Sequence, residues 1–181
     1  MQLNGLMVVN IVFKLKHFMM KFFYTLSFYV LFMTSAKTQV IKMDDLNFLI
    51  NDWKGTLTYI DYKSGNPYTM PANMSFKKLN SNELLAQHIY PDEPKANSID
   101  TFVISNSGKF FNENKIIKVV HLSNNGIEIT TQTKGKDGND NKPALLKHIY
   151  TITKDSFINR KEVKFLDEKK WMLRNEYKFS N

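Results

Sequence analysis

Residues 116–133 read IIKVVHLSNNGIEITTQT, and this stretch decides the fold class. β-Branched residues dominate both of its ends, as they do in strands. The Asn125-Gly126 pair between them is the strongest short signal for a hairpin turn. The stretch therefore predicts two antiparallel strands joined by a tight turn. Its first half is apolar on both faces, so we expect that strand to lie beneath a short helix or the N-terminal segment.

Similar short runs, each followed by turn residues, recur along most of the chain at the spacing that is typical of sandwiches and barrels. The predicted strands cover 56–62, 69–79, 84–90, 98–105, 109–111, 116–122, 127–133, 145–153, 157–166 and 171–179. Pro71 in the second strand indicates an edge position or a bulge. A long polar loop is expected at 135–143. Its Asp-Gly-Asn-Asp-Asn run lacks the later glycine and glutamate of a calcium loop.

Hairpin-length connections imply an antiparallel meander, and a meander of this many strands can close into a barrel. Asp44 and Asp45 start a short helix before the first strand, and the pattern of Leu46, Leu49 and Ile50 gives it an apolar face. The last predicted strand alternates, with Trp171, Leu173, Tyr177 and Phe179 on one face and Arg174, Glu176 and Lys178 on the other. We therefore predict an all-β fold: an antiparallel up-and-down barrel of eight to ten strands with a short N-terminal helix, after a signal peptide.

The first 36 residues contain lysines but no acidic residue. A basic segment precedes an apolar run over 22–33, and Thr34-Ser35-Ala36 follows as a small-residue cleavage site. We predict a signal peptide over 1–36, with the true start at Met19 or Met20, and an exported, periplasmic or secreted domain over 37–181. The apolar run is short for a membrane span, so no stable anchor is expected. An uncleaved anchor that joins both N-terminal apolar stretches is the alternative.

Composition excludes several classes of protein. The chain has no cysteine, which rules out disulfides and zinc–thiolate sites. Its formal net charge of +8 is spread along the sequence and includes three lysines of the leader. Because nucleic-acid binding calls for a one-sided basic patch, no nucleic-acid partner is expected. Export together with many Lys, Asn and Ile residues is typical of a bacterium with an AT-rich genome.

Residues 49–57 read LINDWKGTL, in which a short helix leads to Trp53 two residues before Gly55. This opening resembles the entry of the calycin barrels, which include lipocalins, fatty-acid-binding proteins, nitrobindin-like proteins and small exported bacterial lipocalin-like proteins. The run that begins at Arg174 resembles their last strand. The chain departs from the lipocalin pattern in having Asn51 where that pattern has glycine. The resemblance implies that Trp53, Gly55 and Arg174 close the barrel, with the guanidinium packed across the indole.

The resemblance also implies a small apolar or amphipathic ligand inside the barrel. The candidate cavity residues are Tyr59, His148, Tyr150 and Tyr177, because each lies on a predicted strand among apolar neighbours. The same residues could equally pack a core. Nitrobindin-like barrels bind haem through a histidine, which makes haem conceivable at His148; otherwise no cofactor is expected. The histidines have no metal-ligand spacing, so no metal site is predicted.

Two other functions stay open. A filled barrel could act through its surface, with the stiff, charged loop PDEPKAN at 91–97 as the partner site. An enzyme is less favoured, because the chain has no Gly-x-Ser-x-Gly, P-loop or His-Glu-x-x-His motif and no catalytic residue is assigned. Asn159 and Lys161 share phase with Phe157 and Val163, which hints at polar groups inside the barrel. The oligomeric state is not determined by the sequence.

Overall fold

The computed structural model describes residues 39–181, so the predicted signal peptide lies outside the described residues. Those residues form ten strands and two short 3₁₀ helices. The elements are η1 (Met43–Leu49), β1 (Asp52–Ile60), β2 (Pro67–Lys78), β3 (Glu83–Ile89), η2 (Pro94–Ala96), β4 (Ser98–Val103), β5 (Phe110–Phe111), β6 (Asn114–His121), β7 (Ile127–Asp137), β8 (Lys142–Ile152), β9 (Ser156–Phe165) and β10 (Met172–Ser180). Within this part of the chain, no helix is long and apolar enough to cross a membrane.

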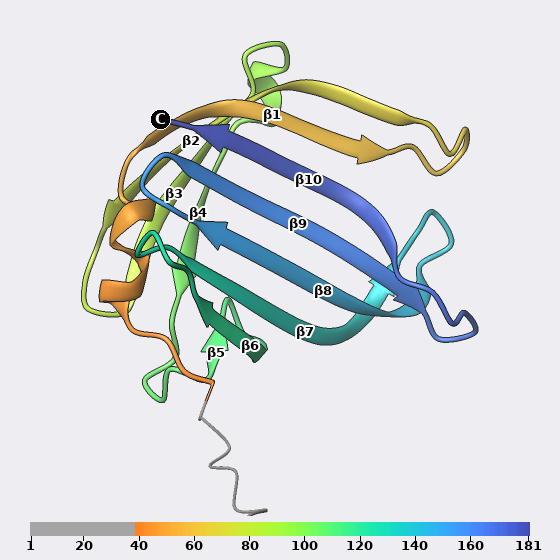
Figure 1. Cartoon of the computed structure of the whole chain (residues 1–181). Helices are drawn as coiled ribbons and strands as arrows, with labels where there is room; N and C mark the ends of the chain where they lie inside the picture. Colours follow the sequence, from red (N-terminus) through yellow and green to blue (C-terminus); the bar gives the residue numbers. More distant parts are fainter. Residues whose placement is uncertain (1–38) are drawn as a thin grey trace, which may run out of the picture. The chain divides into compact units, whose positions relative to one another are not determined.

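All ten strands belong to one antiparallel sheet in the order β4-β3-β2-β1-β10-β9-β8-β7-β6-β5. The sheet curls so that β7–β10 lie on one side and β2–β4 on the other (Figure 1). Its two ends meet at a single bridge between Ile104 and Phe111. Asn112 reinforces this seam, because its backbone N–H donates to the Val103 carbonyl at 2.8 Å and its side chain accepts from the Val103 N–H at 2.8 Å. The sheet is a nearly closed barrel, which confirms the predicted fold class.

The prediction of a long polar loop at 135–143 is wrong. Strand pairing continues to Asp137 opposite Lys142, and only a tight turn separates β7 from β8. Gly138 has a φ of +80° and Asn141 a φ of +50°, which are the residue types that such turns require. Lys134 and Lys136 misled the prediction, because they form the exposed face of a strand and are not part of a loop.

Pro71 lies within β2, opposite Thr56 of β1. On its other side, β2 pairs with β3 only from Asn73, which faces Ile89, onward. Pro71 therefore lies beyond the end of β3, where one flank of β2 has no strand to bond. This is the edge position that the proline indicated.

A register shift between Leu173 and Asn175 corrects the expected alternation of β10. From Asn175 to Phe179 the strand alternates as predicted. At the shift, however, the Arg174 side chain is only 19% exposed, and it packs against Asp137 and the Tyr62 ring at one end of the barrel. Arg174 therefore does not share the outer face with Glu176 and Lys178, because a bulge changes the side to which a residue points.

The end of the barrel next to η1 is filled by large apolar side chains, and we call this end the floor. Its members are Met43, Leu46 and Leu49 of η1 and the aromatic residues Trp53, Phe76, Phe102, Phe111, Phe157 and Phe179, all at most 6% exposed. Neighbouring rings lie 5.2–6.1 Å apart between Trp53, Phe157, Phe76 and Phe102. The indole N–H of Trp53 donates to the Leu49 carbonyl at 2.9 Å, so the floor satisfies its buried donor.

Candidate functional site

The half of the barrel away from η1, which we call the upper half, has a different lining. Inward-facing positions follow the phase of the floor residues, because side chains alternate along each strand. On β7 and β8 this phase brings Thr131 opposite His148, and on β9 and β10 it brings Asn159 opposite Tyr177. We call these four residues the inner polar cluster. They stand directly above apolar side chains that are almost fully buried.

Three atoms of this cluster are buried without a hydrogen-bond partner: Thr131 Oγ1, His148 Nδ1 and Asn159 Oδ1. Leaving one buried polar atom unpaired costs about 1–3 kcal/mol. All three come from neighbouring strands, since Thr131 faces His148 across β7 and β8, and β9 carries Asn159 beside Tyr150. The unpaired atoms are therefore concentrated in one part of the barrel wall.

The surroundings of His148 favour the neutral imidazole. Burial lowers the pKa of His148, and the nearby Lys161 lowers it further, while the Asn159 side chain acts in the opposite direction. Asn159 is close enough to affect the pKa of His148, although no hydrogen bond of ordinary geometry joins them. The imidazole stacks on the Tyr150 ring at 5.9 Å with an angle of 15° between the planes. Its Nδ1 atom is enclosed by protein atoms.

Tyr177 extends the polar lining across the barrel to β3 and its following loop. Its hydroxyl lies 2.8 Å from the hydroxyl of Tyr90, and its ring lies 6.5 Å from that of His88. Burial raises the pKa of Tyr177, and the contact with Tyr90 adds to this shift. Burial lowers the pKa of His88, against the pull of Asp100. Both groups are thus held neutral near pH 7, as donors and acceptors without charge.

A second set of polar residues gathers at the rim of the upper half, and we call it the mouth cluster. It consists of Tyr62, Asp137, Lys161 and Arg174. The Tyr62 hydroxyl donates to Asp137 Oδ2 at 2.5 Å and accepts from the Gly138 N–H at 3.1 Å. The Arg174 guanidinium stacks on the Tyr62 ring at 3.4 Å and donates to the Ile60 carbonyl. Burial and the bond to Asp137 raise the pKa of Tyr62 to about 12.

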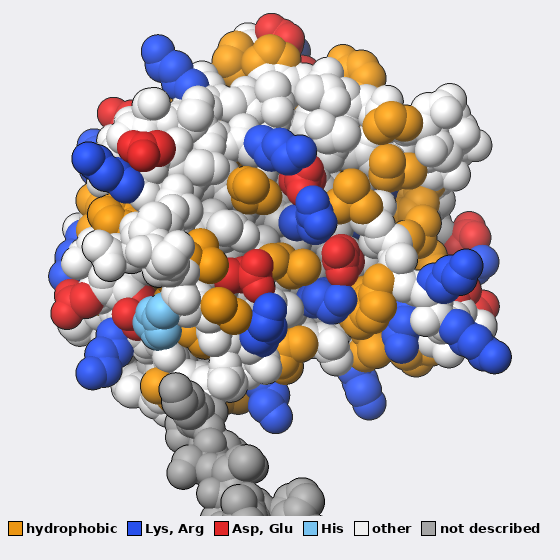
Figure 2. Space-filling model, in the orientation of Figure 1, with side chains coloured by type: hydrophobic (Ala, Val, Ile, Leu, Met, Phe, Trp, Pro, Cys, Tyr) orange, Lys and Arg blue, Asp and Glu red, His pale blue; other side chains and the backbone are white. Residues whose placement is uncertain are grey.

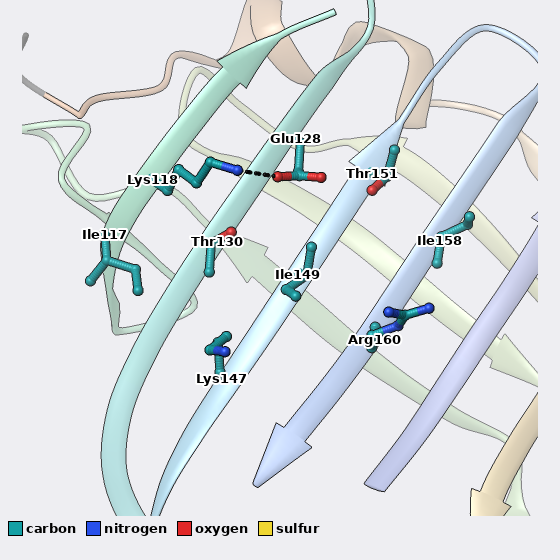
Figure 3. Close-up of a pocket in the computed structure, with 9 residues that line it drawn as sticks. All are labelled: Ile117, Lys118, Glu128, Thr130, Lys147, Ile149, Thr151, Ile158 and Arg160. Carbon is teal, nitrogen blue, oxygen red and sulfur yellow. Dashed lines mark hydrogen bonds and ion pairs between the residues drawn. The ribbon is translucent and has the colours of Figure 1, made fainter. Parts of the chain in front are cut away.

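A pocket of about 480 Å³ lies on the outer face of β6–β9 (Figure 3). It is lined by Ile117, Lys118, Glu128, Thr130, Lys147, Ile149, Thr151, Ile158 and Arg160. These positions are out of phase with the buried Ile129, Tyr150 and Phe157, so the pocket is not part of the barrel interior. Each of its cations is paired, Lys118 with Glu128 at 2.9 Å, Lys147 with Glu162 at 2.8 Å and Arg160 with Glu176 at 2.5 Å. Figure 2 shows hydrophobic, basic and acidic side chains intermixed on this side.

The structure separates the four predicted cavity residues. His148 and Tyr177 belong to the inner polar cluster, whereas Tyr150 is 3% exposed and packs its ring 4.9 Å from Phe111, as part of the filled core. Tyr59 lies near the rim, with its ring 5.4 Å from that of Tyr68. The four candidates therefore share the inward phase of their strands but lie at different levels of the barrel.

The three residues expected to close the barrel are also placed apart. Trp53 lies at the floor, and Gly55 sits where a Cβ would come within 1.9 Å of the Lys178 carbonyl oxygen. Arg174 is next to Asn175, which pairs with Tyr59 of β1. Tyr59 is six residues after Trp53 on the same strand. At about 3.3 Å per residue this is too far for a contact. The guanidinium packs across Tyr62 at the rim instead of the indole, so the expected pairing with Trp53 is wrong.

Several residues of the site escaped the sequence-based prediction. Thr131, Tyr90, Tyr62 and Asp137 carry no motif, and they come from three separate segments: β7 and the connections after β1 and β3. The only available signal was the phase of β9, where Asn159 and Lys161 alternate with buried apolar residues. Within residues 39–181, no three His, Asp or Glu side chains gather in a way that could hold a metal ion.

Comparisons with known proteins support the fold. No family model matches the chain, and no curated protein matches it by sequence. Among solved structures, it is similar to the crystal structure of Rv2717c from M. tuberculosis, with a TM-score of 0.52 and 10% sequence identity. The likeness covers 77% of this chain and 96% of that chain. At this identity the likeness shows a common barrel fold and nothing about activity.

Proposed function

We propose that this barrel binds a small amphipathic ligand in its upper half. The observation that carries the proposal is the inner polar cluster, with its three unpaired buried atoms above an apolar floor. Binding sites in proteins combine an apolar lining with a few convergent polar groups, and unpaired buried atoms call for a partner. The barrel fold is compatible with this use.

The test is native mass spectrometry of the full chain, combined with an absorbance scan over the ultraviolet and visible range. We expect a co-purifying small molecule. His148→Leu should lose that mass, whereas His121→Leu should keep it, because His121 is exposed on β6 and outside the cluster. A Soret band in the wild type would identify the ligand as haem. A clean apo mass, together with no binding of apolar dyes, would contradict the proposal.

A second candidate function rests on a different observation. Residues 91–101 are all exposed, and Ile99 on β4 is 67% exposed. β4 ends the strand order, and it meets the other end of the sheet at its last residue, Val103, which hydrogen-bonds with Asn112, and at the bridge that follows between Ile104 and Phe111. Such an edge is a template for pairing with another strand. A barrel that acts through this edge predicts self-association or partner binding that Ile99→Lys abolishes, measured by sedimentation of the full chain.

A further inference from the structure

The mouth cluster contains more positive than negative charge. Lys161 and Arg174 both approach a single carboxylate, that of Asp137, and the three side chains are 21%, 19% and 12% exposed. The contacts are unequal, because Asp137 lies 3.4 Å from Lys161 Nζ and 3.9 Å from Arg174 Nε but only 2.5 Å from the Tyr62 hydroxyl. Both cations therefore keep donors that Asp137 does not satisfy closely, in a partly desolvated place.

Strand register places Lys161 of the mouth cluster next to the inner polar cluster. Lys161 lies opposite His148 on β8 and opposite Asn175 on β10. Below this level, the inward phase of β1 and β2 brings Leu57 opposite Met70, both apolar. A ligand that enters from the rim thus meets two cations first and an apolar lining deeper in the barrel.

We propose that Lys161 and Arg174 bind the anionic group of the amphipathic ligand, a carboxylate, sulfonate or phosphate, and that Asp137 occupies this place when no ligand is bound. The inference rests on the proposed function, since it names the class of ligand that the upper half takes. Displacement of Asp137 would also release its bond to Tyr62, which ties the connection after β1 to the end of β7.

Acidic residues outside the rim indicate whether the anion binds on the outer or the inner side of the mouth cluster. Asp140, Asp167 and Glu168 line a pocket of about 260 Å³ together with Tyr62 and Lys142. On that outer side three carboxylates face one cation, Lys142, which itself lies 3.9 Å from Asp140, so the net field repels an anion. The favourable position is therefore on the inner side, against the Lys161 ammonium, where partial burial weakens screening by water and salt.

Two dyes that differ by one group provide the test on the full chain. 1-Anilinonaphthalene-8-sulfonate carries a sulfonate, and N-phenyl-1-naphthylamine has the same aromatic skeleton without it. We expect the sulfonate dye to bind about tenfold more tightly at low salt, which is the contribution of one charge-assisted contact. Raising the salt concentration should reduce this preference. Near-ultraviolet circular dichroism of each variant checks that the fold is kept.

Three variants locate the anion site. Lys161→Gln should remove the preference for the sulfonate dye and leave binding of the neutral dye unchanged. Asp137→Asn should strengthen binding of the sulfonate dye only, because the internal competitor loses its charge. Lys147→Gln is the matched control, since it removes the same charge from the outer face and from the lining of the outer pocket. Loss of sulfonate binding in this control would place the anion outside the barrel and overturn the inference.

Two other outcomes separate a failure of the anion site from a failure of the proposed function. If both dyes bind equally tightly and Lys161→Gln changes neither, the ligand has no anionic group at the rim; this inference fails and the proposed function stands. If neither dye binds the wild-type chain, the proposed function fails and this inference fails with it.

Discussion

The floor and the upper half of the barrel are built from the same strands but follow opposite rules. At the floor, rings and aliphatic side chains fill the space, and the buried Trp53 N–H has a partner in Leu49. In the upper half, Thr131, His148 and Asn159 each leave a buried atom unpaired. The two ends therefore differ in what they contribute. Packing at the floor stabilises the fold, and this stability allows the upper half to keep buried polar atoms that are unfavourable for folding.

The largest effect is expected at the floor, for Trp53→Ala. The side chain is 1% exposed and contacts Phe157, so its removal leaves a cavity in a region that η1 covers. We expect a loss of about 3–5 kcal/mol in the free energy of unfolding. Urea denaturation monitored by far-ultraviolet circular dichroism measures it. A loss below about 1 kcal/mol would mean that the floor is not the part that stabilises the barrel.

Gly55→Ala should have the next largest effect. A Cβ at Gly55 would lie 1.9 Å from the Lys178 carbonyl oxygen, and backbone cannot move aside cheaply. We expect destabilisation of about 2–3 kcal/mol by overpacking.

Gly135→Ala is the matched control for this prediction, because the nearest atom there is the flexible end of Leu146 at 2.8 Å. Its effect should be clearly smaller in the same urea titration. Equal effects at Gly55 and Gly135 would contradict the close approach of β1 to β10.

In the upper half the sign of the effect should change. Thr131 is fully buried with an unpaired hydroxyl, so Thr131→Val removes an unsatisfied group and should stabilise the chain by about 1 kcal/mol. Ile129→Val, two residues earlier on β7, should destabilise it by about 1 kcal/mol by removing a buried methylene. Thermal unfolding of both variants side by side measures the difference. The same sign for both would remove the distinction between the two halves.

The smallest effect concerns pH. Burial lowers the pKa of His148 in the folded chain, so the folded state binds protons less readily than the unfolded one. The free energy of unfolding should therefore fall as pH drops below about 6.5, the ordinary histidine value. His148→Gln should show a weaker fall between about pH 7.5 and pH 5.5.

His88 contributes in the same direction, because burial also lowers its pKa, so some pH dependence should persist in the His148 variant. Carboxylates act at lower pH: the pKa of Glu176 is lowered by Lys178 and Arg160 despite its burial. An identical pH profile for wild type and His148→Gln would contradict a buried, neutral His148.

Much of the fold could be predicted because its signals are local. The turn at Asn125-Gly126 and the alternation of β9 depend on residues that are neighbours in sequence, and both agree with the structure. The sequence-based prediction failed at two places where the alternation of polar and apolar residues did not reveal the strand. One bulge at 173–175 placed Arg174 at the rim, and a polar outer face on β7 resembled a loop.

The sequence by itself determined an antiparallel series of short strands with one apolar face, because turn residues and a period of two fix strand order and facing. Only the tertiary structure decided which inward residues share a level of the barrel. Tyr62, Asp137, Lys161 and Arg174 come from separate segments, and the successive pairing of β1, β10, β9, β8 and β7 brings them to one rim. Register and barrel closure are long-range properties, and no local pattern of residues encodes them.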